Sequence, residues 1–276
     1  MLRKAAVAGS WYPGSSTALS KAVDDYLAAA ESEPFVLERL VAIVAPHAGL
    51  MYSGPVAAYA YRLLRAHPVD VVVLVGPSHF VGFEGVAIDR SRGFDTPFGV
   101  AEIDQALCAA LMAATPMIHE RPAAHAREHS LEMQLPFLKR LLPSARIVPL
   151  VMGWQDETTA RSLGEALAVT LRDRHALLVA STDLSHYHDA VTAARLDAVV
   201  IDHVARLDAD GLQRALNSTP DHACGGGPTV AVMDAARQLG ARDGVILRYA
   251  DSGDVSGDKS SVVGYLAAAI GTRPSR

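Results

Sequence analysis

The sequence predicts an α/β fold in which a central, mostly parallel β-sheet is flanked by helices. Apolar runs rich in Val, Ile and Leu, at 40–45, 69–75 and 176–180, are bounded by Pro, Gly or Ser, which is typical of strands buried on both faces of a parallel sheet. Segments with helical spacing of apolar residues separate them, giving strand-helix-strand units. Because no internal repeat or linker interrupts this alternation, we expect a single domain over residues 1–276.

The individual elements follow from periodicity and from start and stop signals. Pro55 suits a first helical turn, so a helix is expected to begin near it. The segment 81–100, with alternating apolar residues and the turn-like DTPFG, predicts a hairpin inserted into the parallel pattern. Helical spacing also runs over 128–143, where Pro136 should kink the helix or start a second one. The other expected helices are 16–30, 54–66, 103–113, 158–172, 190–207, 209–217 and 229–239; the expected strands are 40–45, 69–75, 146–152, 176–180, 244–250 and 261–270.

Composition and charge exclude several classes of function. The chain has 276 residues, of which 50% are hydrophobic and 20% charged, as in an ordinary globular enzyme. A net charge of -5 without any Lys/Arg cluster argues against nucleic acid as a partner. No window approaches a membrane span, and the apolar stretch at the N-terminus is too short for a signal peptide. We therefore expect a cytoplasmic protein with no membrane partner.

Three of the apolar runs are followed by a small turn and then a histidine: His47, His79 and His186. Ligands of open α/β sheets bind beyond the carboxyl ends of the strands, where residues far apart in sequence converge if their strands are neighbours. Neutral imidazole is the commonest metal ligand in proteins. The three histidines together therefore predict a metal site, whereas each one alone would be read as a surface residue.

Cys224 precedes three glycines and Pro228, which lead into a helical segment. A thiol just ahead of a helix N-terminus has a lowered pKa, which favours the thiolate that binds metal or attacks an electrophile. Glycines in addition allow the backbone to approach a ligand closely. The alternative is a loop cysteine without a task. The second cysteine, Cys108, lies in an Ala-rich helical stretch and is expected to be a buried apolar residue.

Acidic residues accompany two of these histidine segments. Asp183 precedes His186 by three positions, so a helical turn would place both on one side; Asp183 either orients a histidine or caps the turn. In EHSLE, the helical spacing of Glu128 and Glu132 predicts one acidic stripe, either solvated or turned inward at Glu132. The histidines elsewhere are expected to lie on the surface, although His222 is close enough to Cys224 to enter the same cleft.

A set of short motifs spread over the whole chain resembles the Memo family, called AmmeMemoRadiSam system protein B in prokaryotes. These motifs are GSWYP, APHAGLMYSG, GPSH, EHSLEMQLPFL, STDLSH, a CG pair and SGDVSGDKSSVVGY, in this order. Each is weak alone, but the combination is specific. The family is similar in fold to the LigB-like class III extradiol dioxygenases, which bind non-haem iron through two histidines and a carboxylate.

The resemblance implies a metal pocket formed by His47, His79 and Cys224, with His186 as an acid/base residue and Asp183 in support. A thiol in place of the carboxylate changes the expected chemistry, because thiolate is a softer ligand that also suits copper or zinc. The expected cofactor is therefore iron or copper, with zinc as an alternative. The family name further implies a radical SAM protein and an AMMECR-type protein as partners.

Three functions are consistent with these residues. The first is a metal-dependent, dioxygenase-like oxidoreductase acting on a small molecule or peptide, in which His186 moves protons. The second is a non-catalytic scaffold that uses the same pocket to bind a peptide or protein. The third is a zinc-dependent hydrolase, for which three ligands and a general base suffice.

Overall fold

The main sheet is mixed, with its parallel strands at the centre. The computed structural model describes residues 1–30 and 37–274; the expected domain 1–276 thus includes eight positions outside the described residues. Along the sheet the strand order is β10-β11-β1-β8-β2-β7-β3-β6, and β9 also pairs with β11. The strands are β1 Arg39–Ala45, β2 Val71–Pro77, β3 Val86–Ile88, β6 Ile118–Glu120, β7 Arg146–Met152, β8 Ala176–Ser181, β9 His186–His188, β10 Asp243–Asp251 and β11 Val262–Thr272.

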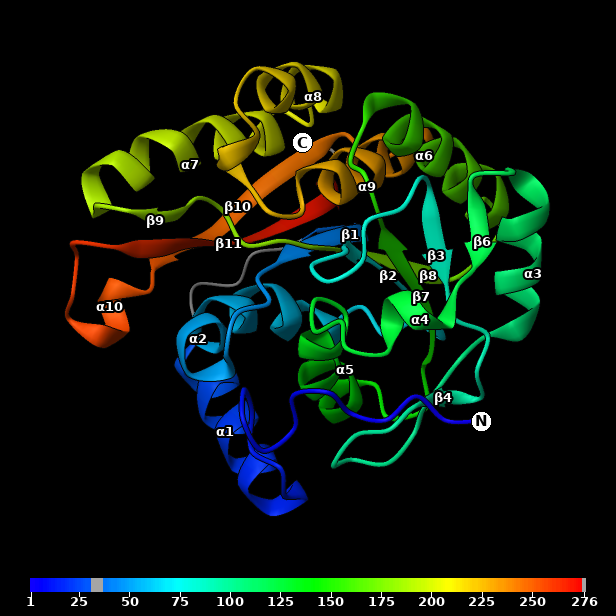
Figure 1. Ribbon diagram of the computed structural model, residues 1–276, viewed down its shortest axis with the longest axis horizontal. Coiled ribbons are helices and arrows are strands. Elements are labelled where there is room, and N and C mark those ends of the chain that lie inside the picture. The colour runs from blue at the N-terminus through cyan, green and yellow to red at the C-terminus, as the bar shows by residue number, and fades with distance from the viewer. Residues whose placement is uncertain (31–36, 275–276) are drawn as a thin grey trace.

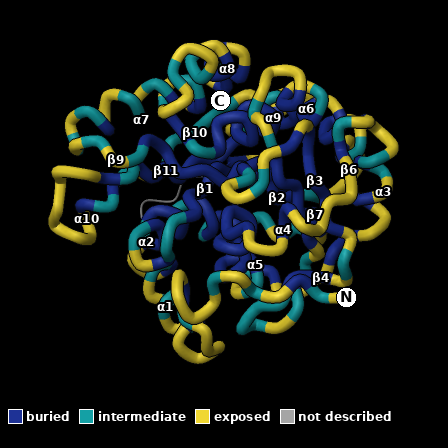
Figure 2. The backbone as a smooth tube through the Cα atoms, in the orientation of Figure 1, coloured by how far each residue is buried: buried dark blue, intermediate teal, exposed yellow. Residues whose placement is uncertain are grey.

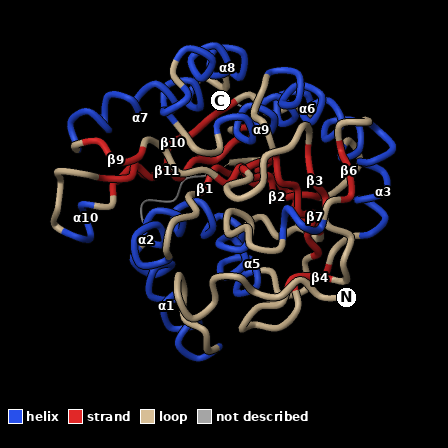
Figure 3. Tube along the Cα trace, viewed as in Figure 1, coloured by secondary structure: helices blue, strands red, loops and turns tan. Residues whose placement is uncertain are grey.

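Helices cover both faces of this sheet (Figure 1 and Figure 3), which confirms the α/β fold class and is consistent with a LigB-like fold. One layer contains α6, α7, α8 and α9, and the other contains α1, α2 and α5. The helices are α1 Ser16–Ala29, α2 Leu50–Tyr61, α3 Gln105–Ala114, α4 Pro122–His125, α5 Leu135–Leu141, α6 Glu157–Leu171, α7 Ala190–Ala205, α8 Ala209–Ser218, α9 Gly226–Gln238 and α10 Gly253–Ser256, with 3-10 turns η1 Arg62–Arg65, η2 Glu132–Gln134 and η3 Pro220–His222. Among the described residues, none of the helices has the length and hydropathy needed to cross a bilayer.

The expectation of a mostly parallel sheet needs correction. β1, β8, β2 and β7 are mutually parallel neighbours, but β11 runs antiparallel to both β1 and β10, and β3 runs antiparallel to β7. The physical reason lies in the connections. A parallel crossover takes about a dozen residues or more, usually with a helix. Only the short segment 252–261, containing the single turn α10, links β10 to β11, so these strands pair as a hairpin.

The core lies where the strands meet the two helical layers, and Figure 2 shows the strands as the most buried part of the chain. On α2, Val56, Ala57 and Ala58 are buried. This helix starts at Leu50 rather than near Pro55, so the expected start is wrong. A proline inside a helix removes one backbone hydrogen bond. The turn before Pro55 nevertheless stays helical, because its residues Leu50 and Ser53 are buried as well.

Two segments between the central strands have a structure that differs from the one their apolar spacing predicts. The expected hairpin in 81–100 is formed in part: β4 Gly93–Phe94 pairs with β5 Ala101–Glu102 in a separate small sheet, while β3 joins the main sheet. In 128–143 only the turn η2 and the helix α5 are helical, with Pro136 in the first turn of α5 as a second start. Residues 128–131 form a loop, so the expected acidic stripe on one helix is wrong.

Candidate metal centre

Three neighbouring parallel strands place polar side chains at the same edge of the sheet. β8 lies between β1 and β2. His47, Asp183 and His79 each stand two residues beyond the last residue of β1, β8 and β2, respectively. Because the carboxyl ends of parallel strands meet at one edge, equal offsets from adjacent strands place these side chains together.

Cys224 reaches this edge from the loop that precedes α9. Its Sγ lies 3.2 Å from Nε2 of His47 and accepts a hydrogen bond from the backbone N–H of Asp183 at 3.3 Å. Gly225 permits this approach, because a Cβ at that position would collide with the carbonyl oxygen of Ser181 and the side chain of Thr182. The glycine after the cysteine therefore has a steric function at the site.

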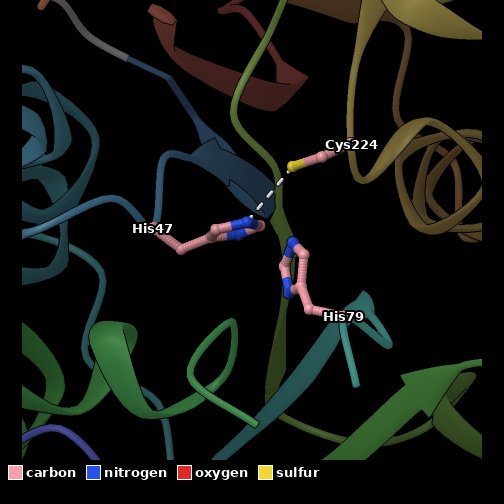
Figure 4. A group of neighbouring side chains, drawn as sticks. All are labelled: His47, His79 and Cys224. Atoms are coloured by element: carbon pink, nitrogen blue, oxygen red, sulfur yellow. Dashed lines mark hydrogen bonds between the residues drawn. The ribbon is translucent and has the colours of Figure 1, made fainter. Parts of the chain in front are cut away.

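The three residues expected to bind metal form one group (Figure 4). A ring nitrogen of His47, a ring nitrogen of His79 and Sγ of Cys224 all lie within 4.8 Å of one another. The two imidazoles meet edge to face, with centroids 5.2 Å apart and an interplanar angle of 81°. His47 is buried, whereas the side chain of His79 is 26% exposed. The structure thus brings the three residues together; that they bind metal stays a prediction.

His47 is held as a neutral ring in a buried environment. Its backbone N–H donates to Oδ1 of Asp183 at 2.7 Å, and its Nδ1 lies 2.9 Å from Oγ of Ser181. Burial, followed by the neighbouring His79, holds the pKa of His47 well below its usual range. A neutral imidazole is the form that binds metal.

His79 is oriented by a buried carboxylate that sequence reasoning did not assign to it. Glu128 accepts from the backbone N–H of His79 at 2.7 Å and lies 2.8 Å from its Nδ1. Burial opposes ionisation of Glu128, but its hydrogen bonds with His79 and Ser130 outweigh that effect and lower its pKa to about 2. A carboxylate that holds one ring nitrogen of a histidine leaves the other nitrogen available as a ligand.

His129 is a second residue that the sequence analysis missed as part of the site. Its ring stacks on His79 with centroids 4.4 Å apart, and it lies 4.3 Å from the ring of Trp11. Burial, together with His47 and His79, lowers the pKa of His129 to about 3. Nitrogen and oxygen atoms of His79, Glu128 and His129 also lie within 4.8 Å of one another. The EHS segment was visible in sequence, but only its carboxylate spacing was interpreted.

Asp183 and His186 form the second polar group of the site. Ligand-type atoms of Asp183, His186 and Cys224 lie within 4.8 Å of one another. Burial raises the pKa of Asp183 and lowers that of His186. The expected helical turn between these two residues is wrong, because His186 begins β9, which pairs with β11. The two side chains are nevertheless neighbours.

The low pKa expected for Cys224 is wrong for the metal-free protein. Burial raises the pKa of this thiol, and the negative charge of Asp183 raises it further. The residue is half-buried and lines a cavity, but its Sγ packs against His47 and the backbone of Asp183. A cation bound at the sulfur would reverse this effect, since a coordinated thiol loses its proton. Cys108, as expected, is buried.

A cavity of about 480 Å³ opens beside the thiol, lined by residues that include Cys224, His186, Tyr187 and Asp221. His222, which was expected either at the surface or in this cleft, is buried, and its Nδ1 donates to the Leu196 carbonyl at 2.9 Å. Buried His125 is likewise not the surface residue expected. The cavity is large enough for a small molecule or for one side chain of a peptide.

The donor set fits a transition metal. Imidazole and thiol groups are ligands that iron, copper and zinc accept, whereas magnesium and calcium prefer oxygen. Hydrogen-bond partners also hold the two histidine rings: Ser181 at Nδ1 of His47 and Glu128 at Nδ1 of His79. Iron, copper and zinc share this donor preference.

Fold and site together define a class: an α/β protein with a His/His/Cys candidate metal centre at the carboxyl ends of its central strands. A family model described as "Memo-like protein" matches residues 3–269. A MEMO1 family protein of Methanothermobacter thermautotrophicus is 37% identical over 96% of this chain and 99% of its own length. Another, of Methanopyrus kandleri, is 39% identical over 97% of this chain and 98% of its own length. The chain belongs to the Memo family.

Proposed function

We propose that this protein is a metal-dependent oxidoreductase whose iron or copper ion is bound by His47, His79 and Cys224. The observation that carries the proposal is the convergence of these three residues, from three separate elements, with ligand atoms within 4.8 Å of one another. When bound, the metal would supply a redox-active Lewis acid for an organic substrate and an oxidant such as dioxygen.

His186 and Asp183 supply the proton chemistry in this proposal. Because burial lowers the pKa of His186, its ring is neutral near pH 7 and accepts a proton from a substrate bound in the adjacent cavity. Asp183 lies beside it and stabilises the imidazolium that results. Asp183 also binds the backbone N–H of His47, so it links the proton acceptor to the metal ligands.

The metal content of the purified protein tests the proposal. We would purify the chain without a metal-chelating step and measure iron, copper and zinc by mass spectrometry in the wild type, His47→Ala and Cys224→Ala. His119→Ala and Cys108→Ala are matched controls, since His119 is exposed on β6 and Cys108 is buried in α3, outside the site. We expect about one metal per chain in the wild type and both controls. Equal, near-zero metal in all five proteins would overturn the proposal.

A second experiment separates redox from hydrolytic and scaffold functions. Metal-dependent oxygen consumption with a catechol or a thiol as reductant supports the oxidoreductase. Zinc-supported activity that is insensitive to oxygen supports the hydrolase, in which His186 acts as general base. Tight peptide binding that survives metal removal supports the scaffold.

One observation favours the scaffold as the second candidate: exposed aromatic residues border the site. Trp11 is 39%, Phe80 51% and Tyr187 81% exposed. Trp11 and Phe80 both contact the ring of His129, and Tyr187 lines the cavity beside Cys224. Exposed aromatic groups of this kind are typical of protein interaction sites. A radical SAM protein and an AMMECR-type protein remain the proposed partners, and co-purification with each tests them.

A further inference from the structure

A chain of buried side chains reaches His47 from the side opposite Cys224. Oγ of Ser181 lies 2.9 Å from Nδ1 of His47, and Nε2 of Gln134 lies 2.7 Å from the same Oγ. The hydroxyl of Tyr61 lies 2.7 Å from Oε1 of Gln134. Ser181, Gln134 and Tyr61 are fully buried, so their hydrogen atoms are shared among these partners rather than with solvent.

The direction of each hydrogen bond follows from the groups that can only accept. The carbonyl oxygen of Pro46 lies 3.1 Å from Nε2 of Gln134, and a carbonyl has no hydrogen to give. The atom facing it must therefore be the amide nitrogen, which fixes the orientation of the Gln134 side chain. Oε1 of Gln134 then accepts from Tyr61, and its amide nitrogen donates to Ser181.

The single hydroxyl hydrogen of Ser181 is also accounted for. Oγ of Ser181 lies 2.7 Å from the carbonyl oxygen of Ser130, and two oxygens at that distance need a hydrogen between them. Since the carbonyl carries none, the hydrogen comes from Ser181. Toward His47, Oγ can then only accept, so Nδ1 of His47 must carry the proton.

We propose that Ser181 is a positioning residue that locks His47 in the Nδ1–H tautomer and so directs the lone pair of Nε2 toward Cys224. The fixed tautomer of His47 is a property of the metal-free fold, whereas its effect on a bound metal rests on the proposed function. It differs from the arrangement at His79, where a carboxylate rather than a hydroxyl holds Nδ1. A neutral acceptor fixes the proton position without adding a negative charge beside the buried ring.

The tautomer is measured directly in metal-free protein with ¹⁵N-labelled histidine, by nuclear magnetic resonance of the ring nitrogens. We expect a protonated Nδ1 and an unprotonated Nε2 for His47 in the wild type. Ser181→Ala should convert His47 to the other tautomer or to a mixture. His79, held by Glu128, is an internal reference in the same spectra and should not change. A wild-type His47 protonated at Nε2 would overturn the proposal, and this measurement needs no variant to fold.

Thr115→Ala is the control. It also removes a buried hydroxyl, one that is hydrogen-bonded to Oγ of Ser162 at 2.7 Å, and it lies outside the site. We expect the Kd for Zn²⁺, a redox-silent probe, to rise about 10–100-fold in Ser181→Ala and to stay within about twofold in Thr115→Ala. An unchanged Zn²⁺ affinity in Ser181→Ala would overturn the positioning role. Failure of the wild type to bind Zn²⁺, Fe²⁺ or Cu²⁺ would instead overturn the proposed metal centre, while the tautomer result would still decide the lock.

Discussion

Glu128 accepts two hydrogen bonds from the same histidine, one from the backbone N–H of His79 at 2.7 Å and one at its Nδ1 at 2.8 Å. Because Glu128 is buried and ionised, it fixes both the backbone and the ring of His79. The pairing also explains how a partly exposed histidine can keep one orientation at the edge of the site.

We expect Glu128→Gln to weaken metal binding by about 10–100-fold, because the amide cannot accept at both positions as the carboxylate does. Isothermal titration of metal-free protein with Zn²⁺ measures this change. Glu120→Gln, at an exposed position on β6, is the control and should bind as the wild type does. Equal affinities for Glu128→Gln and the control would show that the carboxylate does not support the ligand.

Glu132 fixes the N-terminal segment that carries Trp11 to the site. Its carboxylate is fully buried and accepts from the backbone N–H groups of Ala6 and Val7 at 2.8 and 3.0 Å, from the hydroxyl of Tyr12 at 2.7 Å, and from the guanidinium of Arg3. The inward orientation of Glu132, one of the two expected alternatives, is thus the one that the structure contains. Its role there is to bind the chain terminus rather than a ligand.

Glu132→Gln should destabilise the fold by about 3–5 kcal/mol, because it leaves the buried Arg3 charge without its partner. It should also release Trp11. The chain has two tryptophans, so a Trp154→Phe background isolates the emission of Trp11. We expect a red-shifted emission at denaturant concentrations below the global unfolding transition. An unshifted spectrum together with unchanged stability would contradict this role of Glu132.

Some residues of the site can be predicted from the sequence alone. His47 and His79 were found because each follows a buried strand, and parallel strands place their carboxyl ends together whatever the details of the loops. Cys224 was found because glycines mark a close approach of the backbone, which Gly225 indeed makes. The first inference requires the strands to be neighbours, and this condition is met because β8 lies between β1 and β2.

Glu128 and His129 were missed for a physical reason. They lie in a loop, where the helical period assumed for 128–143 does not apply, and their proximity to His79 is set by tertiary packing alone. The prediction of a lowered pKa for Cys224 was wrong for a similar reason. Its position ahead of α9 was foreseen, but its desolvation and the facing carboxylate of Asp183 depend on how the loop folds back over β8.

Gly225→Ala should disrupt the approach of Cys224 to His47. The added methyl would meet the Ser181 carbonyl and the Thr182 side chain, so the loop must move away from the end of β8. We expect a destabilisation of about 1–3 kcal/mol, as for an overpacked core, and a weaker Kd for Zn²⁺. Gly82→Ala is the control, because a Cβ there would meet only Nε1 of Trp154, at an ordinary 3.5 Å. Chemical denaturation and Zn²⁺ titration of both variants measure these effects; identical behaviour would show that the close approach is not required.

His125 should make the protein sensitive to acid. Its Nε2 lies 3.1 Å from the carbonyl of Ala87, which can only accept, so Nε2 carries the proton of the neutral ring. Nδ1 has no partner among the described residues, and burial holds the pKa of His125 below its usual 6.5. The unfolded chain therefore binds a proton more readily than the folded one below about pH 6.5. This part of the stability is present above that pH and declines as the pH falls, by up to about 1.4 kcal/mol per pH unit for one histidine.

His125→Gln keeps a donor toward Ala87 and removes the titration, so its free energy of unfolding should fall less steeply between pH 6.5 and 5 than that of the wild type. Urea unfolding at several pH values measures both slopes, with exposed His119→Gln as the control; parallel curves for the wild type and His125→Gln would show that His125 does not carry the acid sensitivity.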